Sequence, residues 1–242
     1  MPATEAIKHV HATPEDLAVA AASWLCALAS ASSGRFAVSL SGGSTPKRLY
    51  ELLASEPLRG RLPWERVHWF WGDERYVPAD SPDSNYRMTR LAMLERASVP
   101  AANVHPVRTD LPTPEATAAA YAEELQRYYG ARELDPQRPL FDVTLLGMGE
   151  DGHTASLFPG TQVLGERKAW AAAVIGAKPE PRITLTYPVL ESSRDVAFLI
   201  AGAGKRDVLA AIRKGADLPA GRLKPQGRLH WFLDRAADGA AG

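Results

Sequence analysis

The stretch FAVSLSGGSTP, residues 36–46, decides the fold class of this chain of 242 residues. Its first five residues are apolar apart from one serine, which is typical of a strand buried on both faces. A glycine pair follows, and Thr45-Pro46 then gives a helix start signal, an N-cap residue before a proline at the first helical position. A buried strand, a tight turn and a helix in that order indicate a parallel β–α–β unit.

The same units recur along the whole chain. Thr13-Pro14 and Thr113-Pro114 repeat the helix start signal, and residues 83–97 and 205–215 also have helical patterns. Further short apolar strands are predicted at residues 67–71, 141–146, 183–187, 196–200 and 229–233. This alternation predicts one α/β domain over residues 1–242, an open and mostly parallel sheet with helices on both faces. We expect the last few residues, within the tail 236–242, to be frayed.

Composition narrows the function classes. Lys+Arg and Asp+Glu both number 28, so no net positive field draws in nucleic acid or an anionic membrane. The single cysteine, Cys26, excludes an intrachain disulfide and is expected to be inert helix packing. The N-terminus has no signal-peptide pattern, and the uncharged run 17–34 is too short and too weakly apolar to span a bilayer. We therefore expect a cytoplasmic protein with neither nucleic-acid nor membrane partner, and a monomer is favoured.

Four predicted strands end in glycine and polar residues. SGGSTP follows residue 40, GDER follows residue 71, GMGEDGH follows residue 146 and AGAGK follows residue 200. Ligands of open parallel sheets bind at the carboxyl ends of the strands. The sequence therefore predicts that these four loops form one binding site.

The loop GMGEDGH contains G-x-G-x-x-G, but it does not fit a dinucleotide site. Glu150 and Asp151 would repel a pyrophosphate, and Pro159 soon interrupts the following helix. The glycines instead let the backbone turn sharply beneath a ligand. His153 follows the third glycine, and a histidine of ordinary pKa near ~6.5 can act as a general base, with Asp151 fixing its tautomer. The alternative is a surface histidine that caps a helix.

The loop SGGSTP has the composition of a phosphate cradle. Gly42 and Gly43 allow close approach of the backbone, Ser44 and Thr45 add hydroxyls, and the N–H groups of the helix start point at an anion. Two alternatives stay open: a plain strand–turn–helix connection, and a serine-hydrolase elbow at Ser44. The elbow pattern is incomplete because Pro46 replaces its last glycine.

Three cations are candidates for the phosphate. Lys205 ends the loop AGAGK, which lacks the earlier glycine and the Ser or Thr of a nucleotide-binding P-loop. Arg182 precedes a predicted strand, and Arg75 lies in GDER. Each is a candidate point charge for a phosphoryl group, although any one of them could be a solvated surface charge. Asp73 and Glu74 in the same segment supply acceptors for sugar hydroxyls, or local pairing for Arg75.

Taken together, SGGSTP, GDERYVP…SN, GMGEDGHTASLFPG and GAGK give the chain a resemblance to the 6-phosphogluconolactonases, which share a superfamily with the glucosamine-6-phosphate deaminases. The resemblance implies a single Rossmann-like domain. It also implies a carboxylic ester hydrolase that converts 6-phospho-D-glucono-1,5-lactone to 6-phospho-D-gluconate, the second step of the oxidative pentose phosphate pathway, without a metal or organic cofactor. Asn85 fits the lactonase pattern. Deaminases carry a glutamate five residues after the histidine, where this chain has Phe158.

The hypothesis from the sequence is therefore hydrolysis of a phosphorylated sugar lactone. The phosphate docks on Gly42–Thr45 and a cation, His153 takes a proton from the attacking water, and N–H groups of the turn 147–152 stabilise the oxyanion. Three alternatives remain: an isomerase or deaminase, a non-catalytic sugar-phosphate sensor, and an esterase that uses Ser44.

Overall fold

The main sheet has seven strands, and every neighbouring pair in it is parallel. The computed structural model describes residues 6–239. The five strands predicted at 36–40, 67–71, 141–146, 196–200 and 229–233 all belong to this sheet, so the predicted open parallel α/β fold is confirmed. In spatial order the strands are β1 (Ile7–His11), β10 (Arg228–Asp234), β9 (Ser193–Ile200), β6 (Phe141–Leu146), β2 (Phe36–Leu40), β3 (Val67–Trp71) and β5 (Val104–His105).

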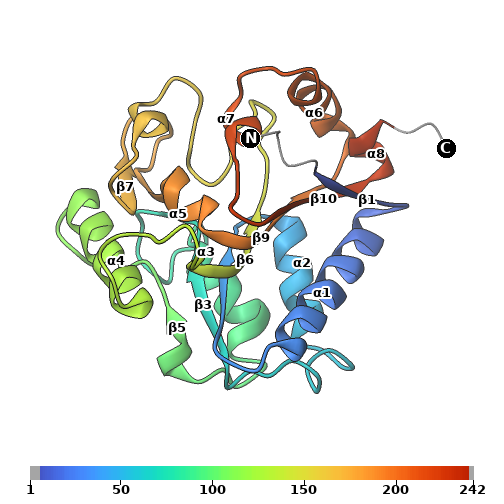
Figure 1. Cartoon of the computed structure of the whole chain (residues 1–242), viewed down its shortest axis with the longest axis horizontal. Coiled ribbons are helices and arrows are strands. Elements are labelled where there is room, and N and C mark those ends of the chain that lie inside the picture. Colours follow the sequence, from blue (N-terminus) through green and yellow to red (C-terminus); the bar gives the residue numbers. More distant parts are fainter. Residues whose placement is uncertain (1–5, 240–242) are drawn as a thin grey trace.

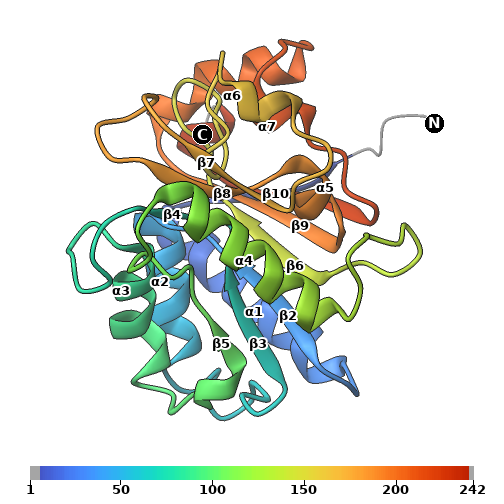
Figure 2. The ribbon, with the colours of Figure 1, turned by 90° about the vertical axis from the view of Figure 1, so that its left-hand side faces the viewer.

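Helices cover both faces of the sheet (Figure 1). The helices α1 (Pro14–Ala31) and α2 (Ser44–Leu53) pack against each other on one face. On the other face lie α4 (Pro114–Tyr129) and a smaller sheet. Figure 2 shows both on the viewer's side of the main strands. The remaining helices are short: α3 (Asn85–Thr89), α5 (Tyr187–Glu191), α6 (Arg206–Arg213), α7 (Pro219–Arg222) and α8 (Arg235–Asp238).

The smaller sheet is antiparallel and corrects one expectation. It consists of β4 (Asp73–Arg75), β8 (Arg182–Leu185) and β7 (Ala171–Val174). The strand predicted at residues 183–187 is thus β8 of this sheet rather than a member of the parallel one, and Tyr187 already begins α5. Four residues are too few to show whether one face or both are buried, so the pattern did not distinguish the two kinds of sheet.

Two predicted helix starts are confirmed by their caps. The hydroxyls of Thr13 and Thr113 accept hydrogen bonds from the N–H groups of Asp16 and Ala116, each at 3.1 Å. The helix predicted over 83–97 is shorter, because α3 passes into one π-helical turn (Arg90–Leu94). In the helix predicted over 205–215, the α-helical part is α6, which begins one residue later.

The predicted frayed tail is partly ordered. Residues 236–238 belong to α8. The N-cap of this helix is Asp234, whose side chain accepts a hydrogen bond from the N–H of Ala237 at 2.7 Å. Residues 240–242 lie outside the described residues, as do residues 1–5 of the N-terminal stretch.

The core lies between the main sheet and its helices, and Cys26 is fully buried in it on α1, as predicted. Within residues 6–239 no helix is long and apolar enough to cross a membrane. The chain runs from β2 to β3 and β5 on one side of the sheet, then returns to β6 and continues to β9 and β10 on the other side. The crevice between β2 and β6 is therefore the point where the strand order reverses, the usual position of a ligand site.

Candidate active site

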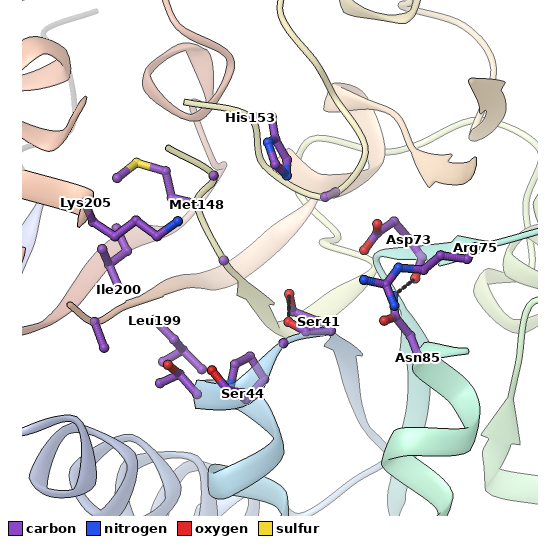
Figure 3. Close-up of a pocket in the computed structure, with 18 residues that line it drawn as sticks. Ser41, Ser44, Asp73, Arg75, Asn85, Met148, His153, Leu199, Ile200 and Lys205 are labelled. Atoms are coloured by element: carbon purple, nitrogen blue, oxygen red, sulfur yellow. Dashed lines mark hydrogen bonds between the residues drawn. The ribbon is translucent and has the colours of Figure 1, made fainter. Parts of the chain in front are cut away.

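A cavity of about 330 Å³ lies at the carboxyl ends of β2, β6 and β9. All four predicted loops contribute to its wall, as Figure 3 shows. Of the candidate site residues, those that line it are Gly42, Gly43, Ser44, Thr45, Asp73, Arg75, Asn85, His153 and Lys205. Asp151 and Arg182 are outside the lining. The predicted convergence of the four loops is confirmed, although these two candidate residues do not line the cavity.

The loop after β2 presents the start of α2 to the cavity. The N-cap of α2 is Gly43, with φ of 109°, so the helix begins at Ser44 and the predicted cap at Thr45 is wrong. Glycine takes this left-handed backbone more readily than any residue with a side chain. The early N–H groups of a helix have no intrahelical partner, so those of Ser44 and Thr45 are available to an anion. Pro46, the next residue, has no N–H to add.

Tyr50 holds this loop from beneath. Its buried hydroxyl accepts the N–H of Ser41 at 2.9 Å and donates to the carbonyl of Ser41 at 2.8 Å. One side chain of α2 thus satisfies both backbone groups of Ser41, the residue that directly follows β2. The sequence analysis did not identify Tyr50, because no local signal connects residues nine positions apart in this way.

Asn85 packs directly on the glycine loop. A Cβ added at Gly42 would lie 2.1 Å from Oδ1 of Asn85, so a larger residue there would displace the Asn85 side chain. The Asn85 amide donates to the carbonyl of Asp73 at 3.0 Å, which joins the loops after β2 and β3. Asn85 therefore shapes the cavity by packing as well as by lining it.

The buried carboxylate of Glu74 organises the GDER segment. Glu74 is 1% exposed, and its two oxygens accept the N–H groups of Arg75, Asn85 and Tyr86 and the hydroxyl of Ser84, at 2.7–3.1 Å. Burial raises the pKa of Glu74, and the three backbone N–H groups act in the opposite direction. Alternation along β4 leaves Asp73 and Arg75 on the cavity side.

His153 is held by Asp151 in one orientation. Its Nδ1 lies 2.5 Å from Oδ1 of Asp151, and the same oxygen accepts the His153 backbone N–H at 3.1 Å. Burial alone would raise the pKa of Asp151, but these two hydrogen bonds outweigh it and the pKa lies below its usual value. An ionised Asp151 can only accept, so Nδ1 carries the proton and Nε2 has the free lone pair. The ring projects towards the cavity (Figure 3).

Gly149 explains part of the glycine pattern. A Cβ at Gly149 would lie 2.1 Å from Nδ1 of His153 and 2.5 Å from Oδ1 of Asp151, whereas one at Gly147 would meet nothing closer than 3.8 Å. The glycine of the turn thus makes room for the histidine ring rather than for a pyrophosphate. On its other side the ring meets Phe158, with ring centroids 4.6 Å apart.

The three predicted cations do not occupy equivalent positions. Lys205 and Arg75 line the cavity, and Arg75 Nη1 donates to the carbonyl of Asp83 at 2.5 Å. Arg182 lies opposite Arg75 in the β4–β8 register, with its side chain 12% exposed. Burial and then the charge of Arg75 lower the pKa of Arg182. Arg182 is therefore placed behind Arg75 rather than on the cavity wall.

Four other histidines hydrogen-bond within the fold, away from the cavity. His230 bonds His9 and Asp195, and His68 bonds His105. Among the described residues no three His, Cys, Asp or Glu side chains group as metal ligands. Ser156 was missed by the sequence analysis and hydrogen-bonds Asp73.

Comparisons with known proteins agree with this fold. A sequence profile described as glucosamine-6-phosphate isomerases/6-phosphogluconolactonase matches residues 12–231. A 6-phosphogluconolactonase of Nostoc sp. is 47% identical over 209 residues, 84% of each chain. That of Synechocystis sp. is 47% identical over 211 residues, again 84% of each chain. The structure of 6-phosphogluconolactonase from Trypanosoma cruzi superposes with a TM-score of 0.86 at 30% identity, covering 98% of this chain and 97% of that one. The chain belongs to the glucosamine-6-phosphate isomerase/6-phosphogluconolactonase family.

Proposed function

We propose that this protein is a carboxylic ester hydrolase that converts 6-phospho-D-glucono-1,5-lactone to 6-phospho-D-gluconate. The observation that carries the proposal is the position of His153, which is oriented by Asp151 at 2.5 Å and lines the same cavity as a glycine-rich helix start and two cations. Lactonases of this family at 47% identity support the choice of substrate.

The substrate phosphate docks at one end of the cavity. The N–H groups of Ser44 and Thr45 and the hydroxyls of that loop donate hydrogen bonds to its oxygens, and Lys205 or Arg75 supplies a positive charge. Asp73 and Asn85 lie where they can bond the sugar hydroxyls. This docking brings the lactone carbonyl to His153.

The chemistry then needs one water molecule and one base. Nε2 of His153 takes a proton from the water, whose oxygen attacks the lactone carbonyl and forms a tetrahedral oxyanion. The C–O bond to the ring oxygen breaks, and His153 returns the proton to that oxygen, which becomes the free hydroxyl of the product. Asp151 stabilises the imidazolium in between. General-base catalysis of this kind contributes about 10²–10⁴-fold.

The turn leaves specific donors for the oxyanion. The N–H of Gly149 donates to the carbonyl of His153 at 2.9 Å, and that of Gly152 donates to the carbonyl of Gly149 at 3.1 Å. We expected N–H groups of residues 147–152 to bind the oxyanion, but these two already donate to carbonyls within the turn. We assign the role to Gly147 and Met148, which line the cavity.

Two alternatives fit the geometry less well. A deaminase would carry a glutamate at position 158, where the buried ring of Phe158 contacts His153 instead. An esterase that uses Ser44 would need His153 beside it, but Figure 3 shows the two on opposite sides of the cavity. These observations favour direct attack by water.

The test is hydrolysis of freshly made lactone, followed as acid release in a pH-stat against the spontaneous rate. We expect rapid loss of the phosphorylated lactone, a much higher KM for unphosphorylated glucono-1,5-lactone, and no deamination of glucosamine 6-phosphate. If the lactone is lost only at the spontaneous rate while 6-phosphogluconate still binds, the protein is a sugar-phosphate sensor.

A further inference from the structure

Three charged groups meet where β4 pairs with β8, yet they do not neutralise one another. The antiparallel register places Arg75 opposite Arg182 and Asp73 opposite Thr184. Over the described residues no ion pair joins Asp73 to either arginine. Arg75 donates to the carbonyl of Asp83, and Arg182 reaches Glu180 at 3.5 Å. Nη1 of Arg182 is buried without a hydrogen-bond partner. A carboxylate beside two guanidinium groups would ordinarily form a charge-assisted pair with one of them.

Ser156 holds the Asp73 carboxylate elsewhere. Its hydroxyl donates to Oδ2 of Asp73 at 2.7 Å. The Ser156 side chain is locked in place, because the residue is 1% exposed and its N–H donates to the Thr184 hydroxyl at 3.2 Å. The Thr184 hydroxyl donates in turn to the carbonyl of Leu185 at 3.0 Å. The contact therefore has one fixed geometry.

Ser156 also belongs to the segment that presents the base. It lies three residues after His153, within a tight turn closed by a bridge between Thr154 and Leu157. Ala155 in this turn has φ of 48°, a left-handed conformation that is unfavourable for a residue with a Cβ. The turn thus joins the His153 loop to the Asp73 segment, which is 83 residues away in sequence.

We infer that Ser156 is a positioning residue that keeps Asp73 from forming an ion pair with Arg75 or Arg182. This inference rests on the proposed function for its substrate, a phosphorylated sugar. With Asp73 held by Ser156, the Arg75 guanidinium stays available to the substrate anion, and Arg182 behind it adds positive potential. The second oxygen of Asp73 stays available to a sugar hydroxyl.

Removal of the Ser156 hydroxyl should therefore let the Asp73 carboxylate compete with the substrate phosphate for an arginine. In Ser156→Ala the Asp73 carboxylate loses its donor and turns towards a guanidinium, which a bound phosphate must then displace. We expect KM to rise about tenfold, the size of effect that one such hydrogen bond gives. We expect kcat to change by less than about threefold, because the hydrogen bond between His153 and Asp151 is untouched.

A double-mutant cycle tests the inference. The dissociation constants of 6-phosphogluconate and of inorganic phosphate are measured by calorimetry for wild type, Ser156→Ala, Asp73→Asn and the double variant. Asparagine carries no charge to pair with arginine. Ser156→Ala should therefore weaken binding about tenfold when Asp73 is present, and it should have little effect when Asp73 is already replaced by asparagine. Ser193→Ala is the control, because Ser193 is equally buried but donates to the carbonyl of Leu190, away from the cavity.

Two results would overturn the role of Ser156: unchanged affinity in Ser156→Ala, or an equal loss in the Asp73→Asn background. Thermal unfolding of each variant checks that the fold is retained. Because binding is measured without turnover, the dissociation constants can be compared even if the lactone proves not to be the substrate. Failure of the proposed function would instead appear as absence of lactone hydrolysis by the wild type.

Discussion

Substitution of Gly149 by alanine should disable His153 without unfolding the protein. The new Cβ would lie 2.1 Å from Nδ1 and 2.3 Å from Cε1 of His153, and 2.5 Å from Oδ1 of Asp151. Ordinary van der Waals contact begins at 3.4 Å, so the ring must move by about 1.3 Å. A displacement of about 1 Å at a reacting group can cost 10²-fold in rate. We therefore expect kcat for the lactone to fall at least about 10²-fold.

Gly147→Ala is the matched control, since it adds the same methyl group two residues away and keeps the backbone N–H that is assigned to the oxyanion. Its Cβ would meet nothing closer than the Ser41 hydroxyl oxygen at 3.8 Å. Neither glycine has a left-handed φ, so neither substitution strains the backbone by itself. The assay is initial lactone loss at saturating substrate, beside urea unfolding of both variants.

The outcome separates packing from general loop damage. We expect Gly149→Ala to lose activity and Gly147→Ala to keep it, with both variants folded. Equal kcat in Gly149→Ala and wild type would refute the account of the glycine spacing, because the ring could then not be in its present position during catalysis. Equal losses in the two variants would show that the loop tolerates no methyl group anywhere.

Three further predictions concern the scaffold. Gly42→Ala forces Asn85 off the loop and should destabilise the fold by about 1–3 kcal/mol, the usual cost of overpacking, and raise KM; urea unfolding and kinetics measure both effects. Tyr50→Phe leaves both backbone groups of Ser41 without their buried partner and should cost about 2–3 kcal/mol in urea unfolding; an unchanged midpoint would contradict the hydrogen bonds described. Burial, and to a lesser extent the neighbouring His105 and Arg35, lowers the pKa of His68 to about 4 from 6.5. The unfolded chain then takes up a proton first as the pH falls from 6.5 to 4, so stability should fall over that window by roughly 1–2 kcal/mol, less than the full shift implies because solvent reaches the ring. His68→Gln should show a smaller fall than the wild type does.

The parallel sheet could be predicted because its central strands are buried on both faces. Segments such as FAVSL and FDVTLL are mostly apolar, and the structure places β2 and β6 at the predicted residues. The antiparallel sheet could not be predicted in the same way. The segment DER is charged at every position and becomes β4 only because β8 pairs with it. The edge strand β1 is half exposed, so it gives a weak apolar signal.

The site shows the same division between local and non-local information. His153 and the glycine loop could be identified because each follows a predicted strand, and the ends of parallel strands meet. Arg182 was predicted to precede its strand but is the first residue of β8, and it does not line the cavity. Tyr50 and Ser156 were missed, because their roles depend on partners that only the folded chain brings to them. Glu74 was expected to accept sugar hydroxyls or to pair with Arg75, but it is buried and accepts backbone N–H groups instead, among them that of Arg75.

The most direct test of the central claim compares lactone hydrolysis by wild type and His153→Ala, with calorimetric binding of 6-phosphogluconate to both. The account predicts that the wild type removes the lactone rapidly. It predicts that the variant falls by about 10²–10⁴-fold, towards the spontaneous rate, while its affinity for 6-phosphogluconate changes little, because the phosphate contacts lie on other loops. A His153→Ala variant that hydrolyses the lactone at the wild-type rate would contradict the assignment of His153 as the base.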